Sequence, residues 1–247
     1  MLFISVLMGC SLSEQERLVT IESSRINIKT QGSGNPTVIF ENGMGSSMDA
    51  WESIPDSIAL LTRVFNYDRA GIGKSDTSAV ARTVPNMVEE LKEVLEKEGL
   101  RPPYIYVAHS MGSYLARYYA LHYPDEIGAL LLVDPSPDQL YDDYTEKEYK
   151  EFKDFGEASY AESTIGVQRE WKNYLPNRKY VQNDSISNEI PMVIISATQW
   201  DFSAYHAAMM NDHKNSRHLK VEGSHDIHQE NPTLIIDIIK ELLIKSK

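Results

Sequence analysis

The feature that most constrains this chain is a serine between an apolar run and a helical pattern. Residues 104–109 read YIYVAH, a β-branched and aromatic stretch typical of a buried strand. Ser110 follows at once, with the small residues Ala108 and Gly112 two positions before and after it, and residues 114–120 have helical spacing. A tight turn brings backbone close to backbone, which favours small side chains. The pattern predicts a strand, a sharp turn and a helix, with the Ser110 hydroxyl exposed at the turn.

Strand and helix signals alternate along the rest of the chain. With 247 residues and 42% hydrophobic side chains, the chain can bury the core of one large α/β domain. Helical spacing marks residues 51–61, 88–95 and 234–243. Strands are predicted at 18–22, 25–30, 38–40, 63–67, 105–107, 130–133, 192–196 and 217–221.

Three other segments accompany the serine turn in a fixed order. Residues 37–47 read TVIFENGMGSS, residues 66–75 read NYDRAGIGKS, and residues 221–232 read VEGSHDIHQENP. Together with the serine turn they resemble the α/β-hydrolase superfamily over residues 18–243, with Ala108 in place of the first glycine of G-x-S-x-G. The resemblance implies an α/β-hydrolase fold at 18–247: a mostly parallel central sheet, helices on both faces and a helical cap insertion.

Between residues 135 and 190 the strand pattern stops. This stretch is rich in Tyr and Glu and is too long for a plain connection. The resemblance implies that it forms the cap over Ser110. The alternative is a loosely ordered surface excursion, but the aromatic content favours packing.

Serine chemistry requires a base that accepts the hydroxyl proton. Ser110 is the expected nucleophile and His225 the expected base, because Glu230 and Pro232 follow it as in the family motif G-x-H-x-x-x-x-E-x-P. His228 is a neighbour in the same motif and is expected to be structural.

The remaining histidines match no motif. His109 is expected to point away from Ser110, and four others are expected at the surface or at helix ends: His122, His206, His213 and His218. The chain has no Cys and His spacing for a metal and no G-x-G-x-x-G for a nucleotide, so neither metal nor cofactor is expected.

Two aspartates compete for the role of the acid that orients the base. Asp201 follows the strand before the histidine strand, where most of the superfamily places the acid, but its loop is irregular. Asp134 ends the strand after the serine strand in the L-D-P-like context Leu132-Val133-Asp134-Pro135. Asp134 is preferred and Asp201 remains the alternative.

An oxyanion that forms during acyl transfer requires backbone N–H donors. Met111, directly after the serine, and Met44, in the loop after residues 37–41, are the expected oxyanion-hole residues. Asp68, Arg69 and Ser75 are expected to brace that loop.

The charge balance bears on partners. Twenty-four basic and 36 acidic residues give a net charge of −12, which argues against nucleic acid and disfavours strongly anionic substrates. The expected partner is a small-molecule acyl substrate, and the expected function is serine hydrolysis of an ester, thioester or lactone. The alternatives are an amidase or peptidase, a carbon–carbon bond hydrolase, or a non-catalytic receptor.

The single cysteine lies at the end of an apolar N-terminal segment. Residues 7–10 read LMGC, which resembles a bacterial lipobox, although no Lys or Arg precedes the apolar run. Residues 1–17 are therefore expected to be a lipoprotein signal and tether, with Cys10 as the lipid anchor of an extracytoplasmic protein. The alternative is an ordinary apolar arm of a cytoplasmic protein.

Overall fold

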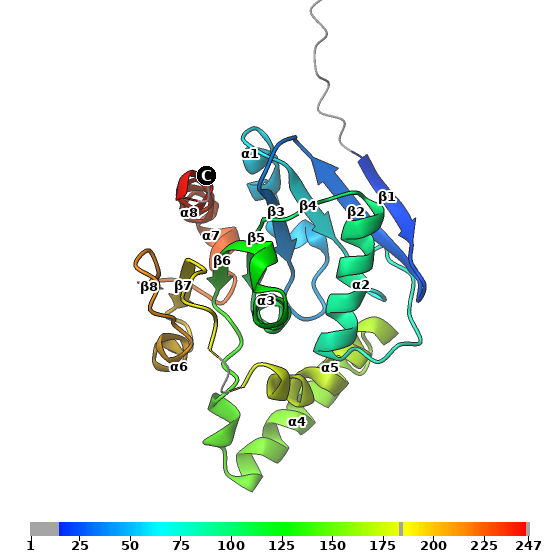
Figure 1. Cartoon of the computed structure of the whole chain (residues 1–247). Helices are drawn as coiled ribbons and strands as arrows, with labels where there is room; N and C mark the ends of the chain where they lie inside the picture. The colour runs from blue at the N-terminus through cyan, green and yellow to red at the C-terminus, as the bar shows by residue number, and fades with distance from the viewer. Residues whose placement is uncertain (1–14, 183–184, 246–247) are drawn as a thin grey trace, which may run out of the picture.

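The computed structural model describes residues 15–182 and 185–245, which build one eight-stranded sheet (Figure 1). The strand order is β1-β2-β4-β3-β5-β6-β7-β8. β2 pairs antiparallel with both of its neighbours, β1 and β4. All other neighbouring strands in the sheet, from β4 to β8, pair in parallel. The strands are β1 (Gln15–Thr20), β2 (Arg25–Gln31), β3 (Thr37–Glu41), β4 (Val64–Tyr67), β5 (Tyr104–His109), β6 (Ile127–Val133), β7 (Met192–Ala197) and β8 (Arg217–Val221).

Helices cover both faces of the sheet. The α-helices are α1 (Ile54–Ala59), α2 (Val84–Lys97), α3 (Gly112–His122), α4 (Glu146–Tyr160), α5 (Ile165–Asn177), α6 (Ser203–Ala208), α7 (Ile227–Glu230) and α8 (Pro232–Lys245). Short 3-10 turns are η1 (Met48–Trp51), η2 (Pro124–Glu126), η3 (Leu140–Asp142) and η4 (Arg178–Tyr180). One apolar core packs α2 and α3 on the sheet, and a second packs α1 and α8 on the opposite face.

The central strands are buried on both sides because helices cover both faces. All six residues of β5 are buried, as are all six of β7. The apolar runs predicted as strands are thus the core of the sheet, and the mostly parallel α/β architecture is confirmed.

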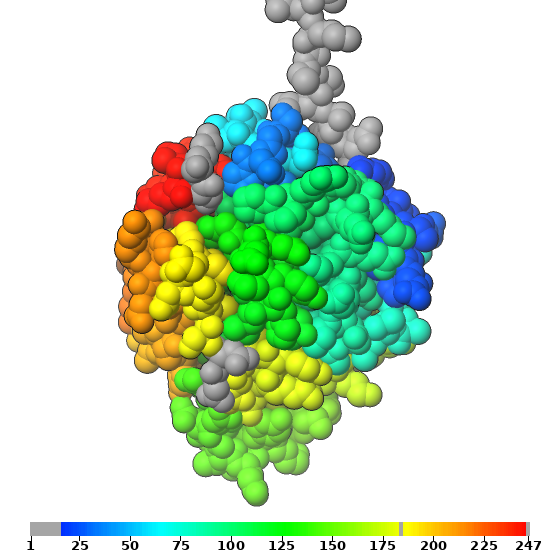
Figure 2. Space-filling view, viewed as in Figure 1, coloured from blue at the N-terminus to red at the C-terminus, as the bar shows by residue number. Residues whose placement is uncertain are grey.

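Residues 135–190, called the insertion below, contain α4 and α5. The two helices pack on each other and form a lobe beside the sheet (Figures 1 and 2). Thr145 begins α4 with a capping box, since its side chain accepts from the Glu148 N–H and Glu148 reaches back to the Thr145 N–H. Trp171 of α5 lies against Gly156 of α4, where an added Cβ would meet the indole ring at 1.8 Å.

Two sequence-based expectations need comment here. The helix predicted over 51–61 is divided into the 3-10 turn η1 and the short α1, with Pro55 in the first turn of α1. Cys10 and its apolar segment lie outside the described residues. Among the described residues, no helix is both long and apolar enough to cross a membrane.

Candidate active site

Ser110 lies at the junction of β5 and α3, as its sequence context predicts. Its backbone is left-handed, with φ 51°, a conformation that non-glycine residues adopt mainly in special turns. The Ser110 N–H donates to the Val133 carbonyl at 3.1 Å, which ties the turn to the end of β6. Gly112 is required by close approach, because a Cβ there would lie 2.6 Å from the Asn42 carbonyl oxygen.

His225 lies in the loop between β8 and α7 and reaches both Ser110 and Asp134. Its Nε2 is 2.8 Å from the Ser110 Oγ, and its Nδ1 is 2.6 Å from the Asp134 Oδ2. An ionised carboxylate can only accept, so Nδ1 carries the proton and donates a hydrogen bond to Asp134. Nε2 is then free to accept the hydrogen bond of the Ser110 hydroxyl.

Asp134 follows β6 and is held on both of its oxygens. While Oδ2 accepts from His225, Oδ1 accepts the Ala197 N–H at 2.9 Å. The side chain is buried, and its backbone is also left-handed, with φ 40°. The end of β7 thus fixes the carboxylate that faces the imidazole.

Asp201 lies elsewhere. It is exposed, accepts the Ser203 hydroxyl at 2.6 Å and pairs with Lys220 of β8 at 2.8 Å. Both contacts lower the pKa of Asp201, and the hydrogen bond from Lys220 has the larger effect. The structure therefore brings Asp134, and not Asp201, to His225.

His206 lies in the last turn of α6, as one of the two expected placements has it, but its side chain is fully buried, which the sequence did not indicate. Its Nε2 donates to the Pro135 carbonyl at 2.7 Å, and its Nδ1 lies 2.6 Å from the Ser196 hydroxyl. Burial lowers the pKa of His206 to about 4, although the charge of Asp134 acts in the opposite direction. A neutral imidazole thus supports the turn that carries Asp134.

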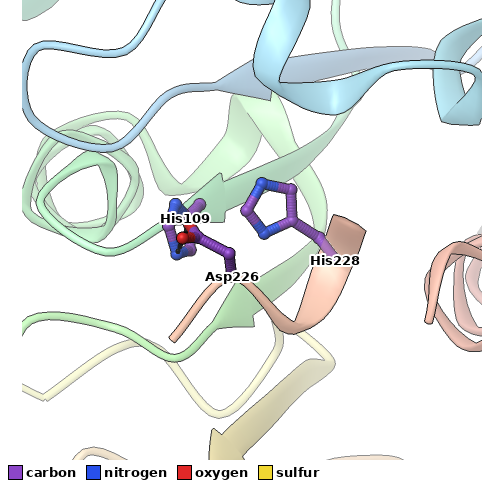
Figure 3. Close-up of side chains that lie close together, drawn as sticks. All are labelled: His109, Asp226 and His228. Atoms are coloured by element: carbon purple, nitrogen blue, oxygen red, sulfur yellow. Dashed lines mark ion pairs between the residues drawn. The ribbon is translucent and has the colours of Figure 1, made fainter. Parts of the chain in front are cut away.

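A second group of side chains lies beside the triad-like cluster: His109, Asp226 and His228, whose ligand-type atoms all lie within 4.8 Å of one another (Figure 3). Such a set could hold a metal only if each residue offered a free lone pair. His109 Nε2, however, donates to the His225 carbonyl at 2.9 Å and so carries a proton. In this arrangement Nε2 of His109 supports the backbone of His225 and is not available as a metal ligand.

The loop after β3 is held by a buried guanidinium. Arg69 donates to the carbonyl oxygens of Asn42 and Gly43, at 2.7 Å each, and to Glu41 at 2.7 Å. On its other side Arg69 donates to both oxygens of Glu170, from α5, at 2.7 and 2.9 Å. The expectation that Arg69 braces this loop agrees with these contacts.

Both carboxylates of this cluster act on the charge of Arg69. Burial alone would lower the pKa of Arg69, but Glu170 and Glu41 raise it above its ordinary value. Burial raises the pKa of Glu41, while Arg69 opposes that shift. Glu41 also accepts hydrogen bonds from the hydroxyls of Tyr67 and Tyr106. Arg69 is therefore charged and fixed in place.

Met44 and Met111, the expected oxyanion-hole residues, flank Ser110. Met44 lines the same pocket as the serine, and Met111 immediately precedes α3. Among the described residues, no protein acceptor takes up the backbone N–H of either methionine. Both donors therefore remain available to a bound group.

Ser110 opens into a pocket of about 400 Å³. Among the described residues that line it there is no Lys or Arg, and Asp226 is the one carboxylate. The insertion supplies most of the wall. Nine aromatic side chains line the pocket: Tyr141, Tyr144, Phe152, Phe155, Tyr160, Trp171, Tyr174, Trp200 and Phe202.

Sequence reasoning missed Glu41, Glu170 and the burial of His206. Glu41 was identifiable, because an acid directly before the Asn42-Gly43 loop ends a buried strand. Glu170 carries no comparable signal, since it is one of many acids in the insertion. Its partner Arg69 is 101 positions away in the chain.

Comparison with known proteins supports the fold assignment. A family model described as the alpha/beta hydrolase fold matches residues 36–164. The uncharacterized protein YqjL of Bacillus subtilis is 25% identical over 240 residues, which cover 89% of this chain and 88% of YqjL. The human (lyso)-N-acylphosphatidylethanolamine lipase is 27% identical over 128 residues, which are 51% of this chain but 36% of the lipase.

Solved structures share the fold at lower sequence identity. A thermophilic esterase from Thermogutta terrifontis superposes with a TM-score of 0.69 at 17% identity, covering 94% of this chain and 99% of the esterase. At this identity the likeness shows the fold alone, but the family model spans more than half of the sequence. The chain belongs to the α/β-hydrolase family.

Proposed function

We propose that this protein is a serine hydrolase that cleaves a carboxylic ester, thioester or lactone through an acyl-enzyme. Ser110 Oγ attacks the carbonyl carbon while its proton passes to His225 Nε2. The tetrahedral intermediate collapses, and His225 returns that proton to the leaving group. A water molecule then repeats the sequence on the acyl-enzyme, releasing the carboxylic acid and restoring Ser110.

The observation that carries this proposal is the continuous hydrogen-bond path from Asp134 through His225 to Ser110, at 2.6 and 2.8 Å. Asp134 fixes the tautomer in which Nε2 accepts, and it stabilises the imidazolium that forms during attack. An isolated serine hydroxyl would not be nucleophilic at neutral pH.

The oxyanion is assigned to the N–H groups of Met44 and Met111. Backbone donors directed at the developing charge are worth a large share of the rate in acyl transfer. That no acceptor within the described ranges takes up either N–H supports this role.

The pocket supports an uncharged, apolar substrate. Aromatic walls favour an apolar acyl or leaving group, and the described part of the lining offers no Lys or Arg to pair with an anionic one. The word lipase in the name of one relative agrees with an ester as the substrate class.

Reaction with a fluorophosphonate probe, together with hydrolysis of p-nitrophenyl esters of rising acyl length, tests the proposal. We expect the wild type to be labelled and active. Ser110→Ala should fold normally, resist labelling and lose on the order of 10³-fold or more in kcat. Full activity in Ser110→Ala would contradict the mechanism.

A further inference from the structure

The oxyanion loop, residues 42–45, is held by the insertion as well as by the sheet. Glu170 of α5 accepts the Gly45 N–H at 2.8 Å through Oε2, the same oxygen that receives Arg69 Nη2 at 2.9 Å. Arg69 Nη2 in turn donates to the Gly43 carbonyl at 2.7 Å. One buried ion pair therefore fixes a carbonyl before Met44 and an N–H after it.

This matters because Met44 supplies one proposed oxyanion donor. The Gly43–Met44 peptide plane contains the Met44 N–H and is held through its carbonyl by Arg69, and the next plane is held through the Gly45 N–H by Glu170. Neither plane can rotate without breaking a charge-assisted hydrogen bond. Gly45 has φ 71°, in the left-handed region, and a glycine there has more backbone freedom than any other residue. The loop's own hydrogen bond, from the Ser46 N–H to the Gly43 carbonyl, is long at 3.3 Å, so the external anchor restricts this stretch further.

The docking of α5 on this loop is close and specific. An added Cβ at Gly166 would lie 2.0 Å from the Gly71 carbonyl oxygen. The backbone at the beginning of α5 therefore contacts the backbone of the loop that contains Gly71. Val167 packs on Gly45, where an added Cβ would lie 3.1 Å from the valine Cγ1. Glu170, one helical turn further along, is fully buried.

We propose that Glu170 is a positioning residue for the oxyanion hole, acting with Arg69 to orient the Met44 N–H toward the substrate carbonyl. The hole is then complete only while α5 is docked, so the insertion contributes to catalysis as well as to the pocket wall. This inference rests on the function proposed above.

The test measures transition-state binding as well as turnover. A trifluoromethyl ketone forms a hemiketal with a catalytic serine, and its oxyanion reports directly on the oxyanion hole. In Glu170→Gln, the charged pair with Arg69 is lost at nearly constant volume. We expect kcat to fall about 10- to 100-fold, with KM within about threefold of wild type. The ketone's Ki should rise by the same factor as kcat/KM falls.

Asp138→Asn is the matched control. Asp138 lies in the insertion and pairs with Arg117 of α3 at 2.7 Å, and both side chains are buried. Like Glu170, it joins the insertion to the sheet domain through a buried Arg, but none of its hydrogen bonds or ion pairs among the described residues reaches the oxyanion loop. Its replacement should lower the melting temperature and leave kcat and the ketone's Ki within about threefold of wild type.

Glu170→Asp gives a second reading if Glu170→Gln does not fold. It keeps the charge but withdraws the carboxylate by one methylene, so it cannot hold both Gly45 and Arg69, and the same parallel losses are expected. Unchanged kcat and Ki in the folded Glu170 variants would overturn the inference, as would equal losses in Asp138→Asn. An inactive wild type that does not bind the ketone would overturn the proposed function, and this inference with it.

Discussion

At the scale of single residues, the site depends on backbone conformations that are rare outside glycine. Ser110 and Asp134, with φ 51° and 40°, both leave the end of a strand in the left-handed region. Each such residue costs on the order of 1 kcal/mol, which the surrounding structure must offset. The turns direct both side chains toward His225 from adjacent strands.

Replacement of the acid by an amide tests the assignment of Asp134. Asp134→Asn should hold His225 in the wrong tautomer, because an amide nitrogen would face Nδ1, and kcat should fall by about 10⁴, as in the serine-protease case. Asp201→Asn is the control and should lose less than about threefold, since it removes only a surface pair with Lys220. Steady-state kinetics of the two purified variants would contradict the assignment if Asp201→Asn were the more impaired.

Local sequence sufficed for some of these residues and not for others. Ser110 and His225 have signals within a few positions of themselves, so their motifs predict their place. The choice between Asp134 and Asp201 depends on which turn faces the imidazole, a property of the assembled sheet. The burial of His206 likewise arises from packing between the ends of β6 and β7.

At the scale of elements, the sheet was more predictable than the insertion. Central strands such as β5 and β7 are uniformly apolar because both faces are covered, and that pattern is visible in the sequence. The boundaries of α4 and α5 were not predicted, although Thr145 and Glu148 form a readable capping box. Their mutual packing through Trp171 and Gly156 involves a contact that no local pattern shows.

At the scale of the whole molecule, several histidines are buried as neutral groups. Burial is the main cause that lowers the pKa of His206 and of His228 to about 4, and it holds the pKa of His109 well below its usual range. In the unfolded chain, each would titrate near 6.5. Between about pH 6.5 and 4 the unfolded state therefore binds more protons, and the folded state loses stability as the pH falls.

Because these histidines are buried as neutral groups, the free energy of unfolding should depend on pH, and replacing one of them should reduce that dependence. Each such histidine contributes about 1.4 kcal/mol of destabilisation per pH unit within that window. His228→Gln cannot titrate, so its free energy of unfolding should fall less steeply between pH 6 and 4.5, by about that amount per unit. Urea denaturation of both proteins at several pH values measures the difference. Parallel curves would show that His228 is not neutral and buried as described.

The most direct test of the proposed acyl-enzyme is the mass of the peptide that contains Ser110, measured during turnover. The protein would be mixed with a p-nitrophenyl ester, quenched in acid before steady state, digested and examined by mass spectrometry. The mechanism predicts that the peptide containing Ser110 carries the acyl mass, with a burst of p-nitrophenol approaching one per enzyme. Turnover without an acylated Ser110 under conditions where deacylation is slow, or an acyl group on another residue, would contradict it.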